Sequence, residues 1–305
     1  MTKNIKITAM ISFFIFLFMC GTGLTTTIID NAGRSIVFDK PFKRIISLYG
    51  AHTENLFHIG ADRQVIGVSV NDSFPKQVKE KQRFSYHDDA EKFIAASPDL
   101  ILIRPMIDKG YKKLFKSLEK LGIQVVSLQP SNIDEMYKYW IKLGQLTGRQ
   151  DSADTMVKEF KQQLKYFKNI NLKIEEKKQV YFEAIHSRMK TFTRNSMPGF
   201  VLQTAGGINI AIDAIPSRNS NIAIYGKEKI LSHAREIDVF LAQKGIMNNI
   251  SRETIVNEPG FSVIKAVNNN QIFLIDEEII SRPVFRLLKG IKTIGCILYP
   301  EFYKD

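Results

Sequence analysis

The stretch RIISLYGAHTENLFHIG, residues 44–60, decides the fold of this chain. Four apolar or small residues, Ile45 to Leu48, form a run typical of a buried strand, and the Thr-Glu-Asn that follows opens a helical pattern. Between the two patterns, Tyr49 and His52 stand just beyond the strand. Ligands of open parallel sheets lie outside the carboxyl ends of the strands. The stretch therefore predicts an α/β fold with a binding site beside this strand.

The same alternation of strand and helix continues along the chain. Short apolar runs predict strands at 44–48, 65–70, 100–104, 125–128, 180–185, 239–243 and 271–275. Helical patterns lie at 53–58, 89–96, 111–121, 133–147, 199–205 and 284–298. A longer helix begins at Asp151, where apolar residues recur at spacings of three and four. Short apolar strands separated by helices indicate parallel sheets covered on both faces.

These patterns divide the chain into two α/β lobes joined by a single helix. The expected segments are a signal at 1–23, an amino-terminal lobe at 24–148, a connecting helix at 149–174 and a carboxy-terminal lobe at 175–305. Two lobes whose strand ends face each other enclose a cleft. The single tryptophan, Trp140, falls at helical spacing with Met136 and Leu143, so we expect it in the core.

The amino terminus carries the pattern of a secretory signal. Lys3 and Lys6 precede the uncharged run ITAMISFFIFLFM, and the small-residue stretch CGTG follows it. The run is shorter than the ~20 residues that a spanning helix needs. An uncleaved membrane anchor and lipidation at Cys20 remain open alternatives. We expect an exported protein of the periplasm or another extracytoplasmic site.

Composition narrows the class of protein. The chain has 43 Lys and Arg against 31 Asp and Glu, but no stretch concentrates the basic residues, so we expect no nucleic-acid partner. The motifs GxSxG, HExxH and GxxxxGK[ST] are absent, which argues against an enzyme. The five scattered histidines leave a secreted metal-dependent enzyme as an alternative. If Cys20 is removed with the signal, Cys296 has no intrachain partner, so stability must come from the core.

Several segments carry motifs of one protein family in a fixed order. The first is TIIDNAGRSIVFDKPFKRIISLYGAHTENLFHIGADRQVIGVS, with a D-x-x-G-R hairpin, a strand and T-E. EKFIAASPDLILI, LEKLGIQVVSL, AGGINIA and SRPVFRLLKGIKTIGCILYPE follow. Over residues 27–302 the chain resembles the substrate-binding proteins of bacterial ABC importers for iron siderophores, haem and vitamin B12, of the helical-backbone type called class III. The resemblance implies two Rossmann-like lobes with parallel sheets, joined by a single long rigid α-helix.

The resemblance also implies a function. It predicts a monomeric receptor, not an enzyme, that has no cofactor and captures a small-molecule metal chelate. The receptor would deliver this ligand to ABC permease subunits in the inner membrane, which a separate ATPase drives. A ferric siderophore is favoured by the basic charge balance. Vitamin B12 or another corrinoid, haem, and a bare divalent metal ion remain alternatives.

Tyrosines, histidines and arginines on loops expected to face the cleft are the candidate ligand-binding residues. A tyrosinate or a neutral imidazole can ligate ferric or haem iron. The planar fork of arginine suits carboxylates, catecholate oxygens and haem propionates. Each histidine could instead be an ordinary polar loop residue, and Arg218 and Arg282 are left unassigned. The candidates are Tyr49, His52, Tyr86, His87, His186, Arg188 and Arg194.

Two glutamates match family positions that dock on the permease. They are Glu91, in HDDAEKFIAASPDL, and Glu228, in IAIYGKEKILSHA. Each lies near the start of a helix-like run, where the helix dipole favours a carboxylate. The resemblance implies that arginine pockets of two permease subunits receive them.

Overall fold

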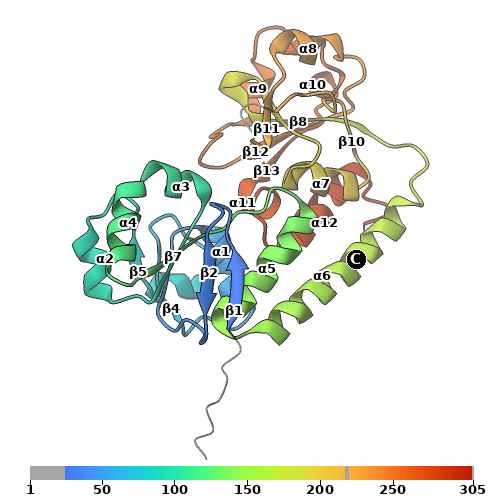
Figure 1. The fold of residues 1–305 in the computed structure, drawn as a ribbon. Coiled ribbons are helices and arrows are strands. Elements are labelled where there is room, and N and C mark those ends of the chain that lie inside the picture. Colours follow the sequence, from blue (N-terminus) through green and yellow to red (C-terminus); the bar gives the residue numbers. More distant parts are fainter. Residues whose placement is uncertain (1–24, 217–219, 304–305) are drawn as a thin grey trace, which may run out of the picture.

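The structure is a computed structural model that describes residues 25–216 and 220–303. The predicted signal segment with Cys20, and also Arg218, lie outside these ranges. Within them, no helix is both long enough and apolar enough to cross a membrane. Two sheets in separate lobes organise the described chain, as Figure 1 shows.

The amino-terminal lobe is built on a five-stranded sheet in the order β5-β4-β3-β6-β7, with all neighbours parallel. Its strands are β3 (Ile45–Ser47), β4 (Val65–Ser69), β5 (Gln82–Phe84), β6 (Leu100–Ile103) and β7 (Gln124–Ser127). Its helices are α1 (Gly50–His58), the 3-10 turn η1 (Lys76–Glu80), α2 (Ala90–Ala96), α3 (Pro105–Gly110), α4 (Lys112–Lys120) and α5 (Ile133–Thr147). An antiparallel hairpin of β1 (Thr26–Ile29) and β2 (Ser35–Phe38) precedes the sheet.

The carboxy-terminal lobe is built on a six-stranded sheet in which β11-β9-β8-β12-β13 are neighbours and β10 also pairs with β8. The parallel strands are β8 (Gln179–Ile185), β10 (Ile208–Asn209), β12 (Val239–Lys244) and β13 (Ile272–Asp276). The strand β9 (Lys190–Phe192) pairs antiparallel with β8, and β11 (Ile222–Ile224) pairs antiparallel with β9. The sequence patterns did not predict these two strands. The helical segments are η2 (His186–Arg188), α7 (Met197–Thr204), α8 (Lys227–Ser232), α9 (Arg252–Val256), η3 (Phe261–Val263), α10 (Lys265–Asn268), α11 (Glu277–Ile280) and α12 (Leu287–Leu298).

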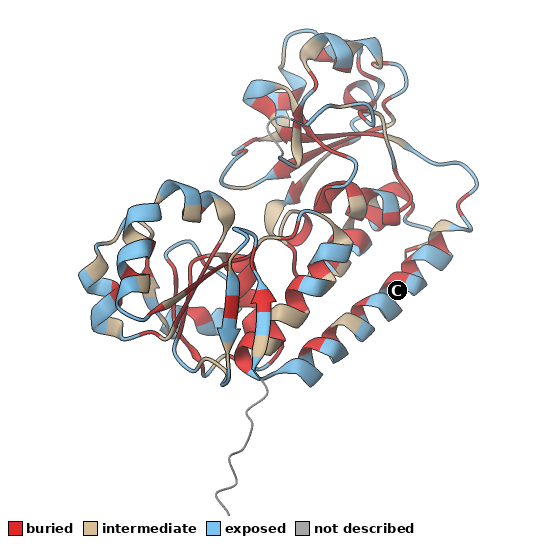
Figure 2. Cartoon of the chain, in the orientation of Figure 1, coloured by how far each residue is buried: buried red, intermediate tan, exposed pale blue. Residues whose placement is uncertain are grey.

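One long helix, α6 (Gln150–Asn171), runs between the lobes (Figure 1). Phe160, Leu164 and Phe167 form part of its buried stripe, and Figure 2 shows buried residues along the side that faces the rest of the molecule. The helix contacts α5 of the first lobe and α12 of the second. Its amphipathic pattern therefore has a direct physical cause, since only one side meets other helices.

An aromatic cluster packs where the lobes meet. Trp140 is fully buried, which confirms the sequence prediction, and its ring centroid lies 5.2 Å from that of Phe160. Phe160 in turn lies 5.8 Å from Phe285, which precedes α12. Helices α5 and α6 and the segment before α12 thus share one apolar core across the junction.

Candidate functional site

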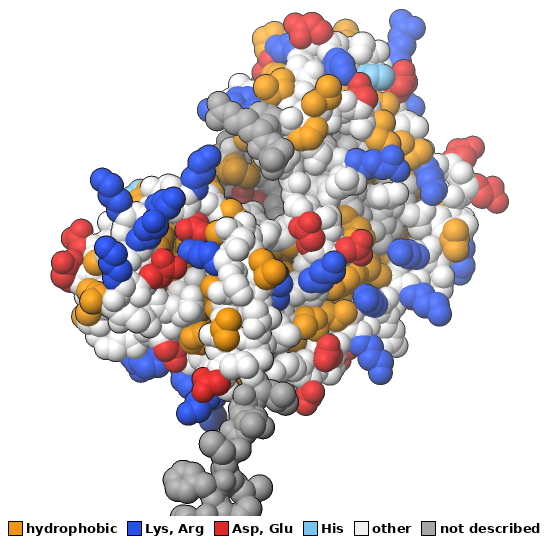
Figure 3. All heavy atoms as spheres, in the orientation of Figure 1, with side chains coloured by type: hydrophobic (Ala, Val, Ile, Leu, Met, Phe, Trp, Pro, Cys, Tyr) orange, Lys and Arg blue, Asp and Glu red, His pale blue; other side chains and the backbone are white. Residues whose placement is uncertain are grey.

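The carboxyl ends of strands from both lobes supply the polar side chains of a cleft, and Figure 3 shows the surface hollowed between the lobes. Tyr49 follows β3 in the amino-terminal lobe and lies near charged side chains of both lobes. Burial raises the pKa of the Tyr49 hydroxyl, and the charge of Arg104 acts in the opposite direction. Arg282 and Glu277, from the carboxy-terminal lobe, also act on Tyr49 electrostatically. Both lobes therefore border the same site.

Tyr49 and Arg104 lie where the strand order of the first sheet reverses. The chain passes from β3 to β4 on one side and later to β6 on the other, so the ends of β3 and β6 form a topological switch point. The guanidinium carbon of Arg104 lies 5.2 Å from the centroid of the Tyr49 ring. Arg104 is half-buried, and no carboxylate pairs with it among the described residues. A partly desolvated, unpaired guanidinium is suited to bind an anion.

A buried carboxyl group lies beneath this point. Thr53 donates a hydrogen bond from Oγ1 to Oδ2 of Asp72 at 2.5 Å. Burial raises the pKa of Asp72 to about 6, although the Thr53 hydrogen bond and the charge of Arg282 lower it. Arg282 can approach because position 50 is glycine: a Cβ there would lie only 2.7 Å from its Nη1. Gly50 thus allows an arginine of one lobe to reach the first turn of α1 in the other.

His52, a predicted ligand residue, lies instead in the core. Its ring is fully buried, with Nδ1 2.7 Å from the hydroxyl of Tyr139 and Nε2 3.0 Å from the carbonyl of Ile103. Burial lowers the pKa of His52 to about 4, so the ring is neutral: it donates to the carbonyl and accepts from the hydroxyl. Both nitrogens are occupied, and we leave His52 out of the site.

His186 lies at the end of β8, between two carboxylates. Its Nδ1 is 2.9 Å from Glu183 and its Nε2 is 3.2 Å from Glu258, which also binds Lys227. Hydrogen bonding to Glu183 is the largest cause that raises the pKa of His186, against the opposing effect of burial. An imidazolium has two donors and no lone pair. Both ring nitrogens face carboxylates in this arrangement, so neither is directed at a ligand in the cleft.

Tyr86 and His87 form an aromatic group with Tyr111 on the amino-terminal lobe. The ring centroid of Tyr86 lies 4.5 Å from that of His87 and 4.8 Å from that of Tyr111. The Tyr111 hydroxyl is 2.9 Å from Nδ1 of His87. Sequence analysis missed Tyr111 because the residue opens a helical pattern 24 positions beyond His87.

Arg188 and Arg194, both expected on loops that face the cleft, lie at opposite ends of the β8–β9 hairpin. Arg188 ends the turn η2 at the carboxyl end of β8, whereas β9 runs antiparallel to β8 and carries the chain back. Arg194, two residues beyond β9, therefore lies past the opposite end of this hairpin. Both side chains are exposed. Arg188, at the carboxyl end of β8, therefore remains a candidate ligand-binding residue, whereas Arg194 lies away from that end.

Glu91 and Glu228 are both exposed and lie in the first turns of α2 and α8. These helices belong to different lobes, α2 at the outer side of the first and α8 at the far end of the second (Figure 1). Neither carboxylate forms an ion pair with another described residue. Each is free to meet an external partner.

Arg104 and Asp72 are the cleft residues that sequence reasoning missed. Arg104 ends the strand predicted at 100–104 and Asp72 follows the one predicted at 65–70, so position at a strand end was an available signal. Their importance depends on the strand order, which places β6 next to β3. The order of strands in a sheet is a long-range property that local patterns do not contain.

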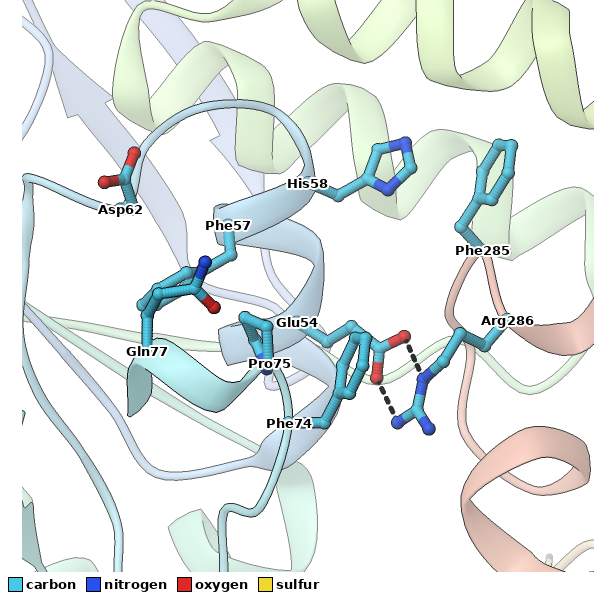
Figure 4. A pocket seen from close by; sticks show the side chains of 9 residues that line it. All are labelled: Glu54, Phe57, His58, Asp62, Phe74, Pro75, Gln77, Phe285 and Arg286. Carbon is cyan, nitrogen blue, oxygen red and sulfur yellow. Dashed lines mark hydrogen bonds and ion pairs between the residues drawn. The ribbon is translucent and has the colours of Figure 1, made fainter. Parts of the chain in front are cut away.

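A separate hollow of about 430 Å³ lies at the lobe junction (Figure 4). It is lined by Glu54, Phe57, His58, Asp62, Phe74, Pro75, Gln77, Phe285 and Arg286, none of which was a candidate ligand residue. Arg286 donates hydrogen bonds to both carboxylate oxygens of Glu54, at 2.7 and 2.6 Å. The Phe74 ring covers the guanidinium, with its centroid 3.9 Å from Cζ. This ion pair joins the two lobes.

Further hydrogen bonds reinforce the junction. The carbonyl of Pro283 accepts from Nδ2 of Asn55 at 3.0 Å and from Nε1 of Trp140 at 3.2 Å. Ser73 donates to Glu278 at 2.7 Å. Each bond joins the amino-terminal lobe to the segment around α11 and α12, so the lobes are tied together at several points.

The described residues also bear on the divalent-metal alternative. No group of three or more His, Cys, Asp or Glu side chains within them could hold a metal ion. The clustered carboxylates at His186 are already engaged with that ring and with Lys227. A bare-ion receptor therefore finds no support in the described part of the cleft.

Comparison with known proteins gives a consistent picture. The pattern of the periplasmic binding protein family matches residues 45–279. The chain is 25% identical over 289 residues to the uncharacterized ABC transporter substrate-binding lipoprotein YvrC of Bacillus subtilis (strain 168), covering 92% of this chain and 87% of that protein. It is 24% identical over 257 residues to the vitamin B12-binding protein of Vibrio campbellii, covering 83% and 88%. The structure of a possible iron-binding, periplasmic solute-binding protein from Staphylococcus epidermidis superposes with a TM-score of 0.74 at 29% identity, over 85% of this chain and all of that one.

Proposed function

Because the chain belongs to the periplasmic binding protein family and is an ABC-transporter substrate-binding protein, we propose that it captures an anionic iron chelate, a ferric siderophore, between its lobes. Members of this family bind solutes and are not enzymes. Such a protein works with a permease and an ATPase. Relatives and structural neighbours are named as iron-, haem- and vitamin B12-binding proteins, so the ligand has to be argued from the cleft.

Arg104 is the observation that carries the proposal. Its guanidinium is half-buried at the switch point and has no carboxylate partner among the described residues. A second arginine, Arg282, reaches the same place from the other lobe and is paired with Glu278 at 3.2 Å. Carboxylate or catecholate oxygens of a ferric chelate would pair with Arg104 through bidentate, charge-assisted hydrogen bonds.

Tyr49 has a supporting role in this proposal. Since burial raises the pKa of its hydroxyl, Tyr49 remains a neutral phenol at neutral pH. A neutral phenol donates a hydrogen bond to a chelate oxygen, whereas ligation of iron would require the phenolate. In this proposal the chelator, and not Tyr49, fills the coordination sphere of the iron.

A corrinoid is the second candidate. Its support is the set of vitamin B12-binding relatives, which share 22–24% identity over more than four fifths of the chain. The aromatic group of Tyr86, His87 and Tyr111 would offer apolar ring faces to such a large ligand. The unpaired guanidinium of Arg104 would bind an anionic chelate more strongly than a corrinoid, and we therefore place the corrinoid second.

Delivery forms the remaining part of the proposal. We place the protein outside the cytoplasm, exported by its amino-terminal segment, with Cys20 as a candidate for lipidation. Glu91 and Glu228 would dock in arginine pockets of the two permease subunits. Support comes from their exposure and from their location on different lobes, as a two-subunit partner requires.

A binding panel tests the ligand assignment. The protein without residues 1–24 would be titrated by calorimetry with a ferric tricatecholate, a ferric trihydroxamate, ferric citrate, cyanocobalamin and haemin. Arg104→Gln should weaken binding of an anionic chelate tenfold or more, since a charged hydrogen bond is worth about 1.5 to 3 kcal/mol. Arg63→Gln is the matched control, because Arg63 is exposed and precedes β4, at the amino ends of the strands. Tight binding of cyanocobalamin alone, or unchanged affinity in Arg104→Gln, would overturn the assignment.

A further inference from the structure

Two apolar side chains stand at the tip of a tight turn after β12. Gly245 and Asn248 close the turn with two backbone hydrogen bonds of 3.2 Å, one in each direction. The tip residues Ile246 and Met247 are 75% and 54% exposed. Turns usually carry Gly, Pro, Asn, Asp or Ser at such positions. Exposed large apolar side chains on a tight turn therefore need an explanation.

The turn is held in a fixed position. Asn248 is buried; its Nδ2 donates to the carbonyl of Gln243 at 2.8 Å, and its Oδ1 accepts from the backbone N–H of His186 at 3.0 Å. Gly245 lies directly against Glu277, where any Cβ would overlap the carboxyl group. The turn is thus tied to the carboxyl ends of β8, β12 and β13. Ile246 and Met247 are presented by a rigid support.

The turn borders the cleft. Glu277, which packs on Gly245, is close enough to Tyr49 of the other lobe to raise its pKa. On that lobe Met106 is 55% exposed in α3, two residues beyond Arg104. In Figure 1, α3 lies at the edge of the amino-terminal lobe that faces the other lobe. Exposed apolar side chains therefore stand beside cleft residues on both lobes, Met106 beyond Arg104 and the turn against Glu277.

We propose that Ile246 and Met247 bind an apolar face of the same ligand whose anionic groups pair with Arg104. The ligand is then an amphipathic anionic chelate, with aromatic or aliphatic surface, and not a compact polar one. This inference rests on the proposed function, because it assigns a second contact to the same bound molecule. Burial of the tip by such a ligand removes apolar surface from water, which favours binding.

The double variant Ile246→Ser with Met247→Asn tests the inference. Neither position has a positive φ, and Ser and Asn are common turn residues that do not require one, so the turn is retained while its apolar surface is removed. Calorimetry would compare two probes, a ferric tricatecholate, whose rings are apolar, and ferric citrate, which is compact and polar. We expect at least a tenfold loss of affinity for the first probe and less than a twofold change for the second. Leu172→Asn, a largely exposed apolar residue at the end of α6, is the matched control and should change neither affinity.

The outcomes separate this inference from the proposed function. If the double variant keeps full affinity for both probes while Arg104→Gln loses it, the inference falls and the proposed function stands. If both probes lose affinity equally, the turn acts by positioning its neighbours, and the apolar contact is refuted. If affinity is intact but transport in cells is lost, the tip binds a partner protein and not the ligand. If the wild-type protein binds neither probe, the inference falls, and if it also fails to bind the ferric trihydroxamate of the panel, the proposed function falls as well.

Discussion

Replacing Arg286 by alanine should lower the free energy of unfolding by about 3–5 kcal/mol, the usual cost of leaving one partner of a buried ion pair alone. Glu54 is only 4% exposed and would lose both of its hydrogen bonds to the guanidinium. At about 1.5 to 3 kcal/mol for each charge-assisted bond, these losses account for the whole range. The Phe74 ring would also lose the cation that it covers. Urea denaturation followed by circular dichroism measures the change.

The loss should depend on pH, with a definite sign. Burial raises the pKa of Glu54 and Arg286 lowers it, so removal of Arg286 raises this pKa further. A carboxyl group with a raised folded pKa destabilises the folded state above that pKa, and this effect disappears once the pH falls below the unfolded pKa. The gap between the wild type and Arg286→Ala should therefore be largest at neutral pH and narrow towards pH 4. An equal gap at every pH would refute an isolated buried charge as the cause.

Two further variants complete the experiment. Glu54→Gln combined with Arg286→Met leaves no buried charge and should recover most of the lost stability. Lys229→Ala breaks a pair with Asp213 in which both side chains are more than half exposed, and it should cost less than about 1 kcal/mol. A loss in Arg286→Ala no greater than that in Lys229→Ala would show that the junction does not depend on its ion pair.

Three other predictions concern the cleft, the permease and export. Glu183→Gln removes the main hydrogen bond that raises the pKa of His186, so the NMR titration midpoint of that ring should fall, and an unchanged midpoint would exclude Glu183 as the cause. In the wild type, the stability that this raised pKa contributes is present at low pH and is lost as the pH rises through the pKa of the folded protein. Glu91→Ala and Glu228→Ala should impair transport in cells while ligand affinity in solution stays unchanged; normal transport by the double variant would reject the docking assignment. Mass spectrometry of the protein from its own envelope should find residues 1 to about 23 absent, and an intact Met1 would reject cleavage of the secretory signal.

The fold was largely predictable because its main strands and helices are marked by local patterns. The strand predicted at 44–48 is present as β3, and the predicted run at 133–147 is α5. Helix α1 begins at Gly50, three residues before the expected Thr53, with Tyr49 at its N-cap. Strands β9 and β11 have three residues each, too few to show an alternating pattern. Sequence patterns therefore identify long elements and overlook short ones.

The site was only partly predictable because a side chain's role depends on distant partners. Tyr49 was placed correctly beside the end of β3 by the strand pattern. His52 had the same local signal, yet its ring bonds to Tyr139, which lies 87 positions away. Because α1 starts before His52, the ring turns with the helix into the core. No local pattern distinguishes these two outcomes.

The stiff junction and the unpaired Arg104 are linked by the energetics of binding. An unpaired, half-buried guanidinium costs stability in the empty protein, and the buried contacts of Glu54, Asn55 and Trp140 at the junction offset that cost. Since these contacts already fix the lobes, little ordering remains to be done when a ligand enters. Less of the electrostatic energy of pairing Arg104 with the proposed ligand is then offset by ordering of the protein, while desolvation of both charges still opposes binding. If the ligand is the anionic chelate proposed above, the junction contacts and the unpaired Arg104 are therefore in place before it binds.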